Sequence, residues 1–269
     1  MKLTDIVLEQ REKVAWVMLN RPNVMNCLDG ETLLQLIHAL QEIEKDAAVR
    51  VVVITGKGEA FSAGADLKFV QTLASAKDLY DWLSLFANTC STLMDLSKPT
   101  IAAVNGIALA GGFELMLACD LAIAAEDAKI GDQHINYALM PAGGATPRLT
   151  WLLGPRRAKE IMLTGKWISG KEAEAIGLVN KAVPAAELEK ATIEMANSLV
   201  SKSPLGLKVM KQLINKAMET NLSMGIAHEL EVATRYLGTS QDVVEGLKAF
   251  TDCRTPAFEG NQAREDKLK

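Results

Sequence analysis

Short apolar runs alternate with longer amphipathic stretches along most of the chain. The run Val51–Thr55 is rich in β-branched residues and is followed by Gly56, which is typical of a buried strand ending in a turn. Between residues 31 and 46, apolar residues recur at the spacing of an amphipathic helix. This alternation predicts an α/β fold made of packed strand and helix layers.

The same pattern locates the individual elements. Strands are expected at Val14–Leu19, Val51–Thr55, Ile101–Val104, Leu121–Ala124 and Val179–Ala182. Helices are expected at residues 30–46, 78–96, 111–118, 155–164, 170–176, 186–201 and 204–219. Beyond residue 200 helical periodicity dominates, with further helices over residues 226–236 and 243–250. We therefore expect an α/β core in residues 1–200 and a C-terminal helical region in residues 201–269.

Charge and cysteine usage narrow the class of protein. The chain has 29 Lys and Arg against 33 Asp and Glu, which gives a net charge of -4 and no basic surface for nucleic acid. Its four cysteines are scattered without a C-x-x-C pair, and the first residues lack an apolar signal segment. The three histidines lie far apart in the sequence, so we expect no metal site. These features predict a protein of the reducing cytoplasm.

The segment from Ile101 to Asp120 carries a single acidic residue, Glu114, within an otherwise apolar run. Asn105, Glu114 and three glycines make this run unsuitable as a membrane-spanning helix. Gly111 and Gly112 are expected to begin a helix whose N-terminus stabilises negative charge. Apolar surroundings raise the pKa of a carboxyl group and suit it to acid or base catalysis. From this segment alone, Glu114 is either a catalytic group or a structural helix cap.

A second small-residue loop follows the strand at Val51–Thr55. The sequence Ala60-Phe-Ser-Ala-Gly-Ala-Asp-Leu-Lys68 again leaves backbone N–H groups free at the end of a strand. Two such loops can supply the two donors of an oxyanion hole for a thioester or ester carbonyl. Together the two loops favour the catalytic interpretation of Glu114.

These segments resemble the crotonase (enoyl-CoA hydratase/isomerase) superfamily from about Val14 to Phe258. The matching parts are Leu19-Asn-Arg-Pro22 with Asn26, Phe61-Ser-Ala-Gly-Ala-Asp66, Lys98 to Asp120, Arg148-Leu149, and Ala173 with Gly177-Leu-Val-Asn180. The resemblance implies a spiral core of β-β-α units and a C-terminal helical region that forms trimers or dimers of trimers. It also implies a coenzyme A thioester as substrate, with no separate cofactor. The carbonyl oxygen is then held by the N–H groups of Ala65 and Gly111, and Glu114 is the first of two catalytic acidic positions.

His134 stands where the resemblance places a second catalytic glutamate. The corresponding stretch is Ala128-Lys-Ile-Gly-Asp-Gln-His134, so a mechanism with two carboxylates is in doubt. Asp132 is two residues early, and strand alternation has to be broken to aim it into the site. An imidazole has an ordinary pKa near 6.5, within the working range of an acid or base. We expect His134 to act in catalysis or to contact the substrate, with a structural role as the alternative.

The resemblance also implies contacts with the rest of the substrate. Candidate substrate-binding residues are Arg21, Ala63, Asp66, Lys68, Tyr137, Phe250 and Phe258. Arg21 and Lys68 match the nucleotide side of coenzyme A, although each is also interpretable as a solvated surface charge. The segment from Phe250 to Phe258 resembles an element that reaches the coenzyme A of a neighbouring subunit. Tyr137 either donates a hydrogen bond in the pocket or only packs there.

The expected function is the addition of water to a 2-enoyl-CoA through an enolate. Other enzymes of the superfamily use the same oxyanion hole, so an isomerase, a hydratase-lyase, a decarboxylase and an acyl-CoA hydrolase are the alternatives. A different class of alternative is a non-catalytic subunit that binds CoA thioesters. The retention of Glu114 in an apolar pocket argues against that class.

Overall fold

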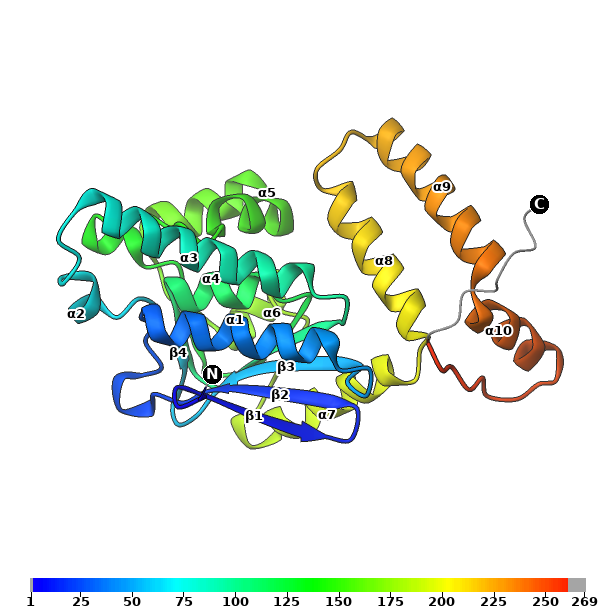
Figure 1. Ribbon diagram of the computed structural model, residues 1–269. Helices are drawn as coiled ribbons and strands as arrows, with labels where there is room; N and C mark the ends of the chain where they lie inside the picture. Colours follow the sequence, from blue (N-terminus) through cyan, green and yellow to red (C-terminus); the bar gives the residue numbers. More distant parts are fainter. Residues whose placement is uncertain (1, 261–269) are drawn as a thin grey trace. The chain divides into compact units, whose positions relative to one another are not determined.

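The computed structural model describes residues 2–260. These residues form two compact units, the first made of residues 2–96 and 100–196 and the second of residues 97–99 and 197–260. Figure 1 shows the helices and strands of both units. The first unit contains both sheets and the residues that surround Glu114.

The larger sheet of the first unit has six strands in the order β1-β2-β3-β5-β7-β10. β1 pairs with β2 in antiparallel orientation, and every following pair is parallel. β2, β5 and most of β3 are fully buried, as expected for a sheet that is covered on both faces. The strands are β1 (Ile6–Arg11), β2 (Val14–Leu19), β3 (Val51–Gly56), β5 (Thr100–Val104), β7 (Leu121–Ala125) and β10 (Lys181–Val183).

A second sheet is made of four short strands, three of which directly follow a strand of the first sheet along the chain. Its order is β4-β6-β8-β9, with β4 (Ala60–Ser62), β6 (Ile107–Leu109), β8 (Lys129–Gly131) and β9 (Ile168–Ser169). The chain passes from β3 to β4, from β5 to β6 and from β7 to β8, and a helical segment follows each pair. This succession is the predicted spiral of β-β-α units.

The helices of the first unit agree with most of the expected positions. They are α1 (Gly30–Lys45), α2 (Leu67–Val70), α3 (Ala76–Asp95), α4 (Gly111–Leu117), α5 (Ala145–Thr164), α6 (Gly170–Ala175) and α7 (Leu188–Val200), the last of which continues into the second unit. In Figure 1, α1 and α3 run above β1, β2 and β3.

Two expected elements differ from the structure. The helix expected at 155–164 begins ten residues earlier, at Ala145, and is interrupted at Gly154, which has φ 75° and ψ 163°. The strand expected at Val179–Ala182 instead covers Lys181–Val183. Leu178 donates its N–H to the carbonyl of Ala173 as the chain leaves α6, so residues 178 and 179 belong to a turn.

The second unit is helical, with α8 (Pro204–Ala217), α9 (Leu222–Thr239) and α10 (Gln241–Thr251). Ser203 and Asn221 cap α8 and α9 by accepting N–H groups of the first helical turn. Phe258 lies close to Gly246 on α10, because a Cβ atom at Gly246 would be 3.7 Å from the Phe258 ring. The expected role of these helices in trimerisation stays a prediction.

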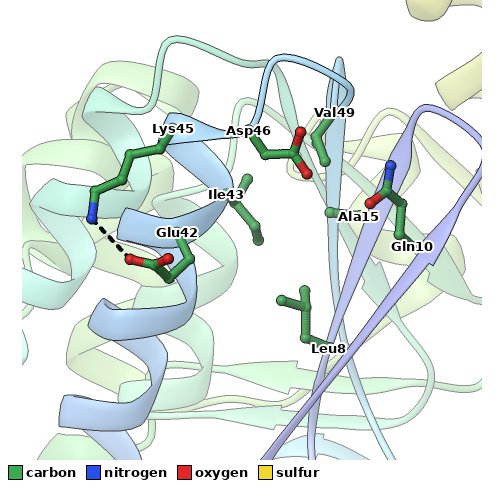
Figure 2. A pocket seen from close by; sticks show the side chains of 8 residues that line it. All are labelled: Leu8, Gln10, Ala15, Glu42, Ile43, Lys45, Asp46 and Val49. Carbon is green, nitrogen blue, oxygen red and sulfur yellow. Dashed lines mark hydrogen bonds and ion pairs between the residues drawn. The ribbon is translucent and has the colours of Figure 1, made fainter. Parts of the chain in front are cut away.

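A surface hollow of about 340 Å³ lies between α1 and the first two strands (Figure 2). Lys45 Nζ lies 2.8 Å from Glu42 Oε1, and Asp46 accepts the backbone N–H of Ala48. The walls of the hollow come from the outer edge of the large sheet, whereas the two glycine loops follow strands of the small sheet.

Gly112 sets how closely α4 approaches β4. A Cβ atom at this position would lie 2.1 Å from the carbonyl oxygen of Ser62, which is backbone and cannot rotate away. The absence of a side chain therefore allows the first turn of α4 to pack directly on the strand that precedes Ala65.

We expect Gly112→Ala to lower the free energy of unfolding by about 2–4 kcal/mol, because α4 or β4 has to shift. Gly30→Ala is the matched control at the start of α1, where the added Cβ meets Phe69 at an ordinary 3.4 Å. Urea denaturation followed by circular dichroism measures both. An equal effect of the two substitutions would contradict the close approach at Gly112.

Candidate active site

Two backbone N–H groups project from neighbouring turns of the spiral. Ala65 follows β4, and Gly111 follows β6, the next strand of the small sheet. The residue before each has a positive φ, 99° at Gly64 and 48° at Ala110. A positive φ is costly for alanine, so Ala110 is a strained residue that sets the direction of the Gly111 N–H.

The two N–H groups lie close together and are available to a ligand. A Cβ atom placed on Gly111 would be 3.6 Å from the nitrogen of Ala65, and one placed on Gly64 would be 3.0 Å from the nitrogen of Gly111. Within residues 2–260, neither N–H donates a hydrogen bond to the protein. Paired free donors of this kind can stabilise a developing oxyanion. The structure thus brings Ala65 and Gly111 together, and their role as an oxyanion hole stays a prediction.

Arg21 holds the Ala65 loop from one side. Its guanidinium donates to Asp66 Oδ2 at 2.9 Å and to the carbonyl oxygen of Cys27 at 2.6 Å, and it lies 3.0 Å from Asp29 Oδ2. Burial opposes ionisation of Asp66, but the N–H groups of Phe69 and Lys68 together with Arg21 outweigh it, so the pKa of Asp66 falls below its ordinary value. Arg21 and Asp66, both expected to bind substrate, thus contact each other.

Asn26 and Ser62 secure the same loop from the other side, a role that sequence analysis missed. Asn26 donates from Nδ2 to the carbonyls of Lys57 and Ala60, and its Oδ1 accepts the N–H of Arg21. Ser62 Oγ donates to the carbonyl of Asn26 and accepts the N–H of Gly64. Both side chains are fully buried, and their signal in the sequence was a polar residue within an apolar or small-residue segment.

Glu114 lies in the first turn of α4, as the sequence predicted, and it is only 1% exposed. Its Oε1 accepts the N–H of Ala145 at 3.1 Å, which places the carboxyl group at the N-terminus of α5. Burial raises the pKa of Glu114 above its ordinary value. The N–H groups of Ala145 and Gly143 and the nearby His134 oppose this rise without cancelling it.

His134 faces Glu114 from the start of a short 3-10 helix, His134–Tyr137. Its Nε2 lies 3.9 Å from Glu114 Oε2, and its Nδ1 lies 3.0 Å from Asp132 Oδ1. Asp132 is 2% exposed, so its carboxylate is directed inward at the imidazole. Because a carboxylate only accepts, Nδ1 donates to Asp132, and Nε2 is the ring nitrogen that faces Glu114. The sequence did not predict that Asp132 would hold His134.

A cavity of about 280 Å³ opens beside these groups. Ala65, Gly111, Glu114 and His134 line it together. The remaining walls are apolar and come from the residue Leu28 before α1, from α2 and α3, and from the segment after His134: Leu28, Leu67, Val70, Leu79, Trp82, Leu83, Phe86, Ala138, Leu139, Met140 and Ala142. The site therefore joins two free N–H donors, a carboxyl group and an imidazole at an apolar hollow.

Other expected contacts lie outside this wall. Ala63 donates its N–H to the carbonyl of Met25, Lys68 is exposed on α2, and Tyr137 is 73% exposed. Phe250 and Phe258 belong to the second unit, and Phe250 is 85% exposed. Ala63, Lys68 and Tyr137 do not line the cavity, and the substrate contacts of all five residues stay predictions.

No group of three or more His, Cys, Asp or Glu side chains among residues 2–260 is arranged to hold a metal ion. None of their helices combines the length and the apolar character needed to cross a membrane.

The raised pKa of Glu114 predicts a pH-dependent gain in stability for Glu114→Gln. The folded state disfavours the ionised carboxylate, so the wild type loses stability as the pH rises through the folded pKa. The neutral amide avoids this loss and can still accept the Ala145 N–H. We expect roughly 0.5–2 kcal/mol of stabilisation at neutral pH, which disappears toward acid pH. Denaturant unfolding from acid to neutral pH measures the difference in the free energy of unfolding between the variant and the wild type. Glu12→Gln in the exposed β1–β2 turn is the control. A difference that stays constant at every pH would contradict the raised pKa of Glu114.

Comparison with known proteins assigns the family. The family model for enoyl-CoA hydratase/isomerase matches residues 9–261. The crotonyl-CoA hydratase of Syntrophomonas wolfei is 38% identical over 96% of this chain and 99% of its own length. The 2,3-dehydroadipyl-CoA hydratase of Escherichia coli is 35% identical over 96% of this chain and 100% of its own. The crystal structure of an enoyl-CoA hydratase from Bacillus anthracis superposes with a TM-score of 0.92 at 37% identity and covers 96% of this chain and all of that one. With Glu114 and the paired N–H groups in place, the chain belongs to the enoyl-CoA hydratase/isomerase family and is an enzyme of the crotonase superfamily.

Proposed function

We propose that the protein is an enoyl-CoA hydratase that adds water across the double bond of a 2-enoyl-CoA. The observation that carries this proposal is the buried Glu114 carboxyl group beside the free N–H groups of Ala65 and Gly111 at one apolar cavity. The thioester carbonyl binds to the two N–H groups, which places the acyl carbons in the cavity. The hydratases named among the relatives support the same reaction.

The attacking water lies between Glu114 and His134. Their facing atoms are 3.9 Å apart, too far for a direct hydrogen bond but close enough for one water to lie about 2.8 Å from both. With Nδ1 bonded to Asp132, Nε2 accepts one water hydrogen and Glu114 accepts the other. An imidazole thus takes the place of the second carboxylate in orienting the water.

Proton transfer then runs through Glu114. As the water oxygen bonds to C3, one water proton passes to the carboxylate and the carbonyl oxygen gains negative charge. The N–H groups of Ala65 and Gly111 stabilise this enolate oxygen. The Glu114 carboxyl group returns the proton to C2, which restores the thioester and the starting enzyme. A raised pKa favours this exchange because the group must accept and release a proton near neutral pH.

We also propose that the enzyme forms a trimer or a dimer of trimers in the cytoplasm. Large apolar side chains are exposed on the helices of the second unit, which favours a surface that another subunit covers. They are Leu222, Leu230, Leu237, Leu247 and Phe250, which are between 62% and 85% exposed. In such an assembly Phe250 and Phe258 reach the coenzyme A of a neighbouring subunit. Four free thiols, including Cys90, whose pKa burial raises to about 12, agree with a reducing compartment.

The reaction is tested by mass spectrometry of CoA thioesters incubated with the enzyme. We expect a 2-enoyl-CoA to gain one water, and Glu114→Gln to lower kcat by about 10²–10⁴ because the proton carrier is lost. Migration of the double bond, loss of carbon dioxide or release of free CoA would transfer the assignment to an isomerase, a decarboxylase or a hydrolase. Unchanged turnover in Glu114→Gln would overturn the role of the carboxyl group.

The role of Asp132 is tested by the pH profile of Asp132→Asn. We expect kcat to fall about tenfold or more with little change in KM, since an amide can donate as well as accept and no longer fixes the proton on Nδ1. Removing this negative charge also lowers the pKa of Glu114, because the charge of Asp132 raises it. The acid limb of kcat/KM therefore moves to lower pH. Asp127→Asn, exposed between β7 and β8, is the control and leaves the profile in place; an unmoved limb in Asp132→Asn would refute the coupling.

A further inference from the structure

Among the described residues, those that line the cavity beside Glu114 offer an acyl group no lysine or arginine. Among the described residues that line it, only Glu114 and His134 have titratable side chains, and neither Lys nor Arg is present. The walls away from these two are formed by leucines, Val70, Trp82, Phe86 and Met140. An acyl group that enters therefore meets mainly hydrocarbon beyond its reacting carbons, together with the indole of Trp82, whose buried N–H has no hydrogen-bond partner among the described residues.

An acyl chain that ends in a carboxylate fits such a cavity poorly. Its charge would lose its hydration and gain no cationic partner, which is strongly unfavourable in apolar surroundings. The ionised Glu114 would add repulsion at short range. A methyl end, in contrast, gains from leaving water.

The volume of the cavity limits the length of the chain. A water-sized group occupies about 30 Å³, so 280 Å³ holds roughly nine such groups. The carbonyl oxygen and the attacking water occupy two of these places. Room then remains for an acyl group of roughly six to eight carbons, more than a four-carbon crotonyl group requires.

Beyond one wall lies a second apolar cavity of about 270 Å³ between the His134–Tyr137 helix and α5. The two cavities have three lining residues in common, His134, Leu139 and Met140. These three residues form the partition between the two cavities. Met140 has a flexible side chain and is 68% exposed, so it is the residue of this partition that moves most easily. Lys159 lines only the second cavity, beyond the partition.

We propose that the enzyme selects uncharged 2-enoyl-CoA thioesters of medium chain length, that it rejects acyl groups ending in a carboxylate, and that Met140 sets the length limit. This inference rests on the proposed hydration reaction and specifies its substrate class. It separates this chain from a relative named for an acyl group that ends in a carboxylate.

A matched pair of substrates tests the selection by charge. 2-Hexenoyl-CoA and 2,3-dehydroadipyl-CoA have six-carbon acyl groups and differ only in a methyl or a carboxylate at the end. We expect kcat/KM for hydration to be about 100-fold higher for 2-hexenoyl-CoA. Comparable values for the two would overturn the selection by charge while leaving the hydratase assignment intact, whereas no water gain on any 2-enoyl-CoA would reject the hydratase assignment itself.

A matched pair of variants tests the partition. The wild type is expected to prefer 2-octenoyl-CoA over 2-dodecenoyl-CoA by about tenfold or more in kcat/KM. Met140→Ala joins the two cavities and should bring this preference within about threefold by a gain on the longer substrate. Met162→Ala, which enlarges only the second cavity, should leave the ratio unchanged. No gain in Met140→Ala, or an equal gain in both variants, would show that Met140 does not set the limit.

Discussion

The burial of a carboxyl group opposite an imidazole is the constraint on which the rest of the site depends. Glu114 is almost wholly removed from water, and its stability there comes from the N–H of Ala145 at the start of α5. The carboxylate thus links the starts of two helices from different turns of the spiral. If either helix moved away, the buried carboxyl group would lose its hydrogen-bond donor, which is unfavourable in apolar surroundings.

The spiral topology explains how distant segments meet at this charge. Because β4 and β6 are neighbours in the small sheet, the loops that follow them lie side by side, and the N–H groups of Ala65 and Gly111 come together. The strain at Ala110 is tolerated because the chain on both sides is fixed, by β6 and by the close approach of Gly112 to Ser62. The Arg21–Asp66 ion pair and the buried Asn26 then restrain the Ala65 loop.

The sequence predicted the parts of this arrangement that depend on local rules. Glu114 in the first turn of α4 follows from a glycine pair after a buried strand. The pattern of strands and helices predicted only an α/β fold, and the spiral was implied by the family resemblance. Strands of two or three residues, such as β8 and β9, are too short for periodicity to reveal. The contact of Asp132 with His134 depends on the left-handed backbone of Gln133, with φ 57°, which no residue pattern indicates. The cavity walls come from α2, α3 and residues 138–142, and their spacing is a tertiary property.

The proposed catalytic groups and the proposed acyl walls therefore lie in different parts of the first unit. The proposed catalytic groups follow strands of the small sheet or lie in the first turn of α4, and hydrogen bonds fix their positions. The acyl walls lie on α2, α3 and the segment after His134, where apolar packing can change without disturbing a buried charge. Relatives named for a short apolar acyl group and for a dicarboxylic one match this chain almost equally well over nearly its full length. Overall identity thus reports the shared reaction and does not distinguish between these acyl groups.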